Sequence, residues 1–138
     1  MFALDRLTKA LVAASIPYGT EVSAIGHLVG ITNVRNSGAA FGVAPAFTWI
    51  FALASIVVSI GLVIYVMRTP SPTWNDAVLG LILGGTAGNG YDRVLVGTVT
   101  DFVNVHIWPV FNVADSAIST GVVLLLAGYL IRREPHEP

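Results

Sequence analysis

The stretch Ala46–Met67, AFTWIFALASIVVSIGLVIYVM, runs for 22 residues without one charged side chain. About 20 apolar residues in a helix are enough to cross the roughly 30 Å hydrocarbon core of a bilayer. Arg68 follows directly, and Pro70 and Pro72 prevent the helix from continuing. This stretch therefore predicts a membrane-spanning helix. We interpret the rest of the chain as part of a membrane protein.

The composition of the whole chain favours the same environment. Of its 138 residues, 54% are hydrophobic and 11% are charged, whereas about 25% are charged in a soluble domain. The net charge of −1 offers no general attraction for nucleic acid, so we expect no nucleic-acid partner. There is no cysteine, and the three histidines are scattered, so we expect neither a metal nor another cofactor. The length predicts a single domain, 1–138, embedded in the membrane.

Three further segments have helical character. Phe111–Ile131 is a second apolar span of 21 residues, ended by two arginines. Ala77–Gly90 is apolar and rich in glycines that recur every fourth residue, a spacing that lets another helix approach closely. Phe2–Ile16 is too short and too charged to cross a bilayer alone, and we interpret it as the second half of a membrane helix. The recurring glycines are Gly80, Gly84 and Gly88.

The segment Tyr18–Pro45 differs from the others because it carries β-type patterns. His27–Val34 and Ala39–Val43 resemble short strands, and Asn36–Gly38 has the residues of a turn. We expect a small sheet lying on the membrane surface. The predicted fold is therefore an all-α membrane protein, a bundle of four transmembrane helices whose first helix is truncated, with a small extra-membrane β-sheet.

Basic residues suggest the orientation of the chain in the membrane. Arg68 and the pair Arg132–Arg133 end two predicted spans, and cytoplasmic loops are enriched in such residues. If both lie in the cytoplasm, Tyr18–Pro45 and Tyr91–Val110 lie on the opposite side. We expect the candidate catalytic carboxylates on that outer side.

The few carboxylates carry most of the functional information, because ionisable groups at membrane depth are costly. Asp76 stands in the capping-box pattern that begins at Thr73, which indicates a structural role. Asp115 follows Asn112 at the spacing of a helix cap, and Asp101 fits a loop carboxylate that binds backbone N–H groups. For each of the latter two, the structural and the functional interpretation stay open.

Taken together, Asp101 and Asp115 suggest a catalytic pair. Trp108-Pro109 forbids one continuous helix between them, so a re-entrant stretch can bring both carboxylates to the membrane surface. Two adjacent carboxylates do not both ionise cheaply, so one keeps a proton. The ionised member can take a proton from water while the protonated member donates a hydrogen bond to a scissile carbonyl, as in aspartic proteases. The neighbouring Asp92–Arg93 is interpreted as a charged structural pair.

Five motifs occur in a fixed order along the chain. They are Asp5–Lys9 (DRLTK), Asn36–Phe41 (NSGAAF), Gly84–Arg93 (GGTAGNGYDR), Val99–Phe102 (VTDF) and Phe111–Ser116 (FNVADS). Together they closely resemble lipoprotein signal peptidase, the bacterial signal peptidase II family. The match extends from Asp5 to about Arg133.

The resemblance implies a four-helix inner-membrane aspartic protease, multi-pass, with both termini cytoplasmic and its site toward the periplasmic face. The implied substrate is a prolipoprotein whose lipobox cysteine already carries diacylglycerol, cleaved just before that cysteine. The enzyme is expected to act as a monomer in the lipid bilayer without a cofactor. The family's surface sheet would correspond to Tyr18–Pro45, and its helical lid to the stretch between Arg93 and Pro109.

The resemblance also assigns residues. The family's two catalytic aspartates match Asp101 and Asp115. Positions that support the site or contact substrate match Asp5, Lys9, Asn36, Asn89, Asp92, Arg93 and Asn112. Two features depart from the family pattern: Arg6 stands where glutamine is usual, and only four residues precede Asp5.

Two other functions compete with proteolysis. A proton- or cation-coupled transporter also uses membrane carboxylates, but it would need them near mid-bilayer, and no inverted repeat is present. A non-enzymatic assembly subunit would explain the glycines but would leave Asp101 and Asp115 without a role.

Overall fold

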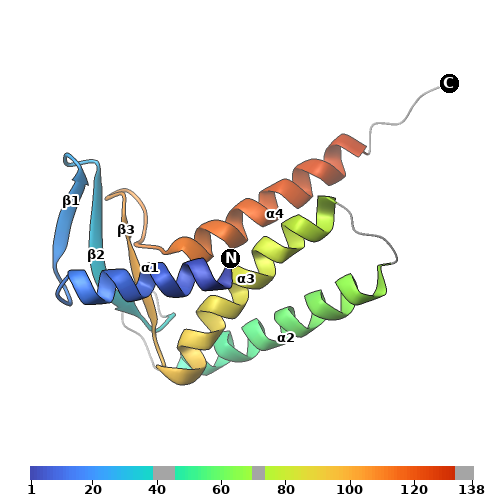
Figure 1. The fold of residues 1–138 in the computed structure, drawn as a ribbon, viewed down its shortest axis with the longest axis horizontal. Helices are drawn as coiled ribbons and strands as arrows, with labels where there is room; N and C mark the ends of the chain where they lie inside the picture. Colours follow the sequence, from blue (N-terminus) through green and yellow to red (C-terminus); the bar gives the residue numbers. More distant parts are fainter. Residues whose placement is uncertain (39–45, 70–73, 133–138) are drawn as a thin grey trace.

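The computed structural model describes residues 1–38, 46–69 and 74–132, and all statements below concern these residues. Helices and strands alternate along the chain, with the strands gathered at one end of the helices (Figure 1). In order, the elements are α1 (Phe2–Ser15), β1 (Glu21–Ile25), β2 (Val29–Asn36), α2 (Ala46–Arg68), α3 (Trp74–Leu95), β3 (Val99–Asn104) and α4 (Val113–Arg132).

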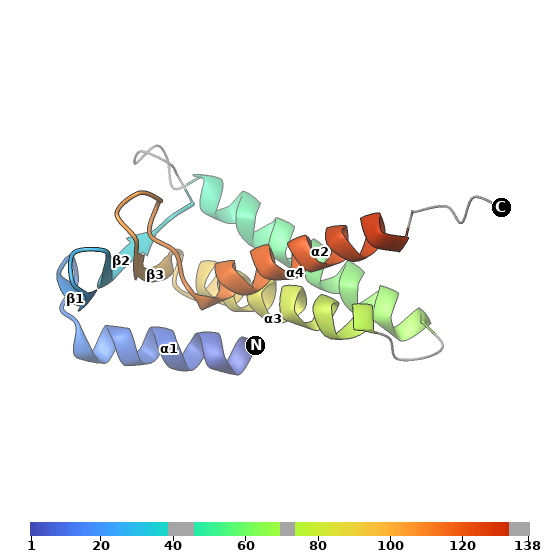
Figure 2. The same cartoon turned by 90° about the horizontal axis from the view of Figure 1, so that it is seen from above.

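Helix α3 is the centre of the helical layer. It packs against α2 and α4 along most of its length and against α1 near its middle, and Figure 2 shows α1 and α2 on opposite sides of it. The four predicted helical segments are therefore all helices, each within a few residues of its expected bounds. Pro17 accounts for the end of α1 at Ser15, because proline excludes helical geometry from the residue before it.

Two of the described helices are long and apolar enough to cross a membrane, namely Thr48–Arg68 and Val113–Ile131. Only 6% and 17% of these stretches is buried, so their apolar side chains face outward, which suits contact with lipid. Helix α3 has 22 residues but carries charged side chains and many glycines, and α1 has 14 residues. The predicted four helices and small sheet are present, and passage of all four helices through the bilayer stays a prediction.

The sheet has three antiparallel strands in the order β1-β2-β3. The predicted strand His27–Val34 corresponds to β2, which begins two residues later. The predicted turn after it is also present, because Asn36 Oδ1 accepts a hydrogen bond of 2.7 Å from the N–H of Gly38, whose φ is +84°. The predicted strand Ala39–Val43 lies outside the described residues, and β1 was not predicted.

The expected helical lid between Arg93 and Pro109 is wrong, because this stretch contains β3. The residues Val99 and Phe102 are buried, and β3 pairs with β2 through Asp101 and Val34. The route from α3 to α4 is therefore a sheet strand and a loop, and the chain turns back so that Phe111 pairs with Val103 just before α4. The expected return to the start of the last helix is present, and its depth in the membrane stays a prediction.

One side chain connects all three strands. Glu21 on β1 extends across Gly30 of β2, where an added Cβ would lie 2.4 Å from the Glu21 Cδ atom. Its carboxylate accepts a hydrogen bond of 2.6 Å from Asn104 Nδ2 on β3 and lies 3.0 Å from His106 Nε2. These two contacts lower the pKa of Glu21, with the Asn104 hydrogen bond contributing most. The hairpin is thus connected to the loop that leads to α4.

Glycines of α3 allow two different helices, α1 and α4, to approach it closely. An added Cβ would lie 2.6 Å from Met1 Cβ at Gly84 and 2.5 Å from Asp5 Oδ2 at Gly88, so these two admit α1. At Gly85 it would lie 2.6 Å from the carbonyl oxygen of Ala114 on α4. Gly80 has no described atom within 4 Å, so the expected continuous glycine face is shorter than predicted.

These contacts predict opposite effects for two alanine substitutions in one helix. Gly85→Ala should lower the free energy of unfolding by about 2 kcal/mol, because the backbone of α4 must move away. Gly80→Ala, the matched control, should leave it unchanged or raise it by up to about 1 kcal/mol through helix propensity. Thermal unfolding of both purified variants in one detergent measures the difference, and equal midpoints would contradict the packing of α3 on α4.

Candidate active site

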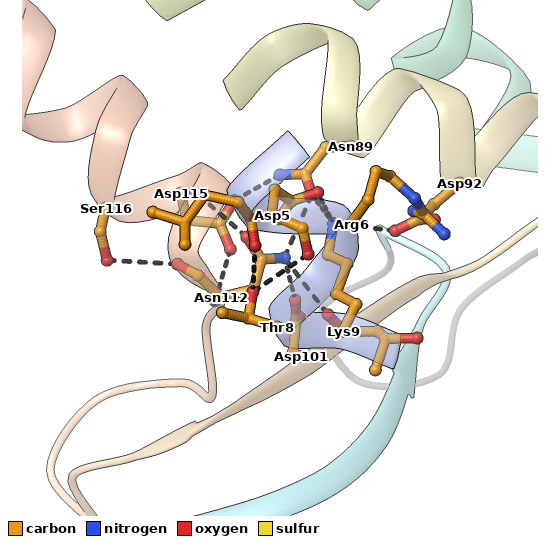
Figure 3. Close-up of polar contacts among 12 residues, drawn as sticks. Asp5, Arg6, Thr8, Lys9, Asn89, Asp92, Asp101, Asn112, Asp115 and Ser116 are labelled. Carbon is orange, nitrogen blue, oxygen red and sulfur yellow. Dashed lines mark hydrogen bonds and ion pairs between the residues drawn. The ribbon is translucent and has the colours of Figure 1, made fainter. Parts of the chain in front are cut away.

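A network of buried polar side chains lies where α1, α3 and α4 meet the end of β2 and the middle of β3 (Figure 3). It joins eight of the nine predicted site residues through hydrogen bonds and ion pairs. They are Asp5, Lys9, Asn36, Asn89, Asp92, Asp101, Asn112 and Asp115. The ninth, Arg93, lies beside the network.

Asp101 lies on β3 and is 3% exposed. Each of its carboxylate oxygens accepts one amide hydrogen bond, Oδ1 from Asn112 Nδ2 at 2.7 Å and Oδ2 from Asn36 Nδ2 at 2.8 Å. Strands β2 and β3 are paired, and their register brings Asn36, at the end of β2, next to Asp101. The sheet therefore fixes the orientation of this carboxylate.

Asp115 lies in the first turn of α4 and is partly exposed. Its Oδ1 accepts a hydrogen bond of 2.7 Å from Asn89 Nδ2, and its Oδ2 accepts one of 3.1 Å from the backbone N–H of Asn112. In return, Asn112 Oδ1 accepts a hydrogen bond of 3.0 Å from the backbone N–H of Asp115. This reciprocal pair is a capping box, so the structural interpretation of Asp115 is confirmed.

Asn112 connects the two carboxylates. Its side chain is fully buried, its Nδ2 donates to Asp101, and its backbone N–H donates to Asp115. The same Nδ2 lies 3.1 Å from Asn89 Oδ1. Helix capping and the positioning of both aspartates are thus performed by the same side chain.

Lys9 connects α1 to α3. Its ammonium group lies 2.8 Å from Asp5 Oδ2, 2.8 Å from Asp92 Oδ2 and 2.8 Å from Asn89 Oδ1. Lys9, Asp5 and Asp92 are at most 3% exposed. Because burial of an unpaired charge is costly, these ion pairs are what allow α1 to lie against α3.

The predicted pairing of Asp92 with Arg93 is wrong. Neighbouring residues on a helix point about 100° apart, and Asp92 instead forms an ion pair with Arg6. The guanidinium of Arg6 also lies 4.6 Å from the centre of the Tyr91 ring. Residue Arg6, which departs from the family pattern, is thus a part of the site that sequence reasoning missed, since 86 positions separate it from Asp92.

Arg93 faces the other way. Its guanidinium carbon lies 5.4 Å from the centre of the Phe51 ring on α2. It is also near enough to Asp115 and Asp101 to interact with both electrostatically. Arg93 is therefore a second cation, besides Lys9, that lies near the two aspartates.

The environment of Asp101 changes its protonation. Burial raises its pKa from 3.8 to about 6, and repulsion from Asp115 acts in the same direction. The hydrogen bonds from Asn36 and Asn112 oppose the increase but do not cancel it. A carboxyl with a pKa this close to neutral can exchange a proton during a reaction.

A cavity of about 390 Å³ lies beside Asp115 and gives a ligand access to it. Its lining residues are Trp108, Phe111, Asp115, Ser116, Ser119 and Thr120. Within residues 1–38, 46–69 and 74–132, no group of three or more His, Asp or Glu side chains is arranged to hold a metal ion. Of the two aspartates, Asp115 lines the cavity, and Asp101 lies behind it, connected through Asn112.

Known proteins share this sequence and fold. A model of the family described as signal peptidase (SPase) II matches residues 1–131. The lipoprotein signal peptidase of Rhodococcus jostii is 46% identical over 141 residues, covering 98% of this chain and 71% of that protein. The lipoprotein signal peptidase of Desulfitobacterium hafniense is 44% identical over 128 residues, covering 91% and 85%.

A solved structure also resembles this fold. It is described as a bacterial membrane enzyme determined at 1.9 Å by the in meso method. The match has a TM-score of 0.86 and 30% identity, and it covers 97% of this chain and 88% of the other.

The ion pairs of Lys9 predict that its loss destabilises the protein. Lys9→Met should lower the free energy of unfolding by about 3 kcal/mol or more, because Asp5 is left buried without its cation. The double variant Asp5→Asn/Lys9→Met should recover part of this loss, since Arg6 still pairs with Asp92. Size-exclusion profiles and thermal midpoints of the two variants test this, and equal instability of both would contradict it.

Proposed function

Since this chain belongs to the signal peptidase II family, a family of membrane proteases, we propose that it cleaves signal peptides from prolipoproteins as an aspartic endopeptidase. The observation that carries the proposal is the link through Asn112, whose side chain binds Asp101 and whose backbone binds Asp115. Two carboxylates held by one residue beside a cavity match the requirement for general acid–base catalysis.

The two aspartates have different environments, and we assign different roles to them. Asp101 has the pKa raised to about 6, so it is the member that holds the shared proton. We assign the activation of water to Asp115, because it lies at the start of α4 and lines the cavity.

The reaction proceeds in two steps. Asp115 takes a proton from water as the water oxygen attacks the scissile carbonyl carbon, and Asp101 gives its proton to the carbonyl oxygen, which forms a tetrahedral diol. Asp115 then gives its proton to the peptide nitrogen, the carbon–nitrogen bond breaks, and Asp101 recovers a proton from the diol. The products are a signal peptide with a new carboxylate and a mature protein with a free amino group.

The other site residues position these groups. Asn36 and Asn89 each hold one carboxylate oxygen of the pair. The ion pairs of Lys9 with Asp5 and Asp92 hold α1 against α3 and so support the two carboxylates. We assign Arg93 to the substrate, because its cation lies near both aspartates and has no described ion-pair partner to hold it in place.

The substrate we propose is a prolipoprotein whose cysteine already carries diacylglycerol, cleaved just before that cysteine. Such a substrate stays in the bilayer by its acyl chains, and the apolar outer faces of α2 and α4 suit this approach. The domain, 1–138, acts in the inner membrane as a monomer with its site toward the periplasmic face. The family and the position of the sheet at one end of the helices support the proposed location and orientation.

The two aspartates give the direct test. Asp101→Asn and Asp115→Asn should each reduce cleavage of a diacylglyceryl-modified prolipoprotein by about 10³-fold or more while the protein stays folded. Asp76→Asn, at the opposite end of α3, is the matched control and should retain cleavage. A gel-shift assay with lipidated and unlipidated substrate measures both, and full activity of Asp101→Asn would refute the proposed pair.

The pKa of Asp101 predicts the pH dependence. The value of kcat/KM should fall about tenfold per pH unit above about 6, because the free enzyme then loses the proton that the pair shares. The folded state binds this proton more tightly than the unfolded chain does. The thermal midpoint should therefore decrease as the pH rises from 4 to 6, and the decrease should be smaller in Asp101→Asn than in the wild type. A profile of kcat/KM that is flat from pH 6 to 8 would contradict the assignment of the proton to Asp101.

A further inference from the structure

A second polar cavity adjoins the network and shares no lining residue with the cavity at Asp115. Its volume is about 230 Å³, and it is enclosed by α1, the end of α3, β2 and β3. Its polar lining residues are Arg6, Lys9, Arg35, Asp92, Thr98 and Thr100. The proposed proteolysis uses neither this space nor Arg35.

The charges around this cavity do not cancel. Three cations face one carboxylate, that of Asp92. Arg6 forms an ion pair with Asp92, and Lys9 pairs with Asp5 as well as with Asp92. The remaining cation is Arg35, whose exposed side chain makes no hydrogen bond or ion pair with another residue of the described part of the chain. The cavity therefore carries an excess of one positive charge.

We propose that this cavity binds the phosphodiester group of an anionic membrane phospholipid. A phosphodiester is a monoanion, so it balances the single excess charge. The planar fork of a guanidinium suits two phosphate oxygens, and Arg35 is free to supply it. The hydroxyl-bearing residues Thr98 and Thr100 lie in the same lining and offer donors of the kind that phosphate accepts.

The surroundings favour a lipid over a free phosphate ion. Val96, which lines the cavity, and its neighbour Leu95 are exposed apolar residues at the end of α3. Acyl chains can lie against these side chains while the headgroup occupies the cavity. The cavity lies where α3 ends at Leu95 and the sheet begins, which in the orientation of the proposed function is the outer end of the helices.

Binding of defined lipids tests the proposal independently of proteolysis. Native mass spectrometry of the purified protein would compare phosphatidylglycerol with phosphatidylcholine of identical acyl chains. The wild type should prefer the anionic lipid, and Arg35→Gln should reduce this preference by about tenfold, because a charge-assisted contact is lost. Arg35→Lys should lose less of the preference than Arg35→Gln, because the charge stays while the planar fork is lost. Thr98→Val, which keeps the charge, should lower the preference by about twofold.

The matched control removes the same charge elsewhere. Arg68→Gln, at the far end of α2, should leave the preference within about twofold of the wild type. An equal loss in Arg68→Gln and Arg35→Gln would overturn the proposal, because it would show general attraction to the net charge. So would a preference that Arg35→Gln leaves unchanged. If the wild type binds inorganic phosphate through Arg35 but shows no preference for phosphatidylglycerol over phosphatidylcholine, the cavity binds a free ion and the lipid proposal fails.

Discussion

The buried ammonium group of Lys9 is the interaction on which the rest of this structure depends. It lies within 2.8 Å of oxygens from Asp5, Asp92 and Asn89, so one cation joins α1 to α3. Only glycine at position 88 leaves room for Asp5 beside α3. The ion pairs of Lys9 form only if α1 lies close to α3. In turn, α1 can lie this close only because the ion pairs compensate its buried charges.

The side-chain amides of three asparagines connect these ion pairs to the carboxylates of Asp101 and Asp115 and orient them. Asn89 contacts Lys9 through its oxygen and Asp115 through its nitrogen, so the helical ion pairs and the site share one side chain. Asn112 and Asn36 orient Asp101 from α4 and from the sheet. Amides suit this task because each offers both a donor and an acceptor without adding charge to a buried site. The carboxylates are thereby oriented before any substrate arrives.

Local patterns were sufficient to predict the helices, and ordered motifs were sufficient to predict which residues gather. Apolar runs such as Ala46–Met67 determine a helix by themselves, and the cap at Asn112 is a local signal. Strand β3 was missed because its hydrogen bonds are made with β2, about 65 positions earlier in the chain. The partner of Asp92 was missed for the same reason, since adjacency in sequence suggested Arg93 and the fold supplied Arg6. Pairings between distant segments are decided by packing, which no short stretch encodes.

The division of one charged cluster between the first and third helices has a consequence for biogenesis. When α1 leaves the ribosome, Asp5 and Lys9 have only each other, and Asn89 and Asp92 follow about 80 residues later. A helix that carries Asp5, Arg6 and Lys9 is a poor substrate for release into lipid. The insertion machinery must then retain α1 until α3 has been synthesised, so that membrane entry and tertiary assembly become one event.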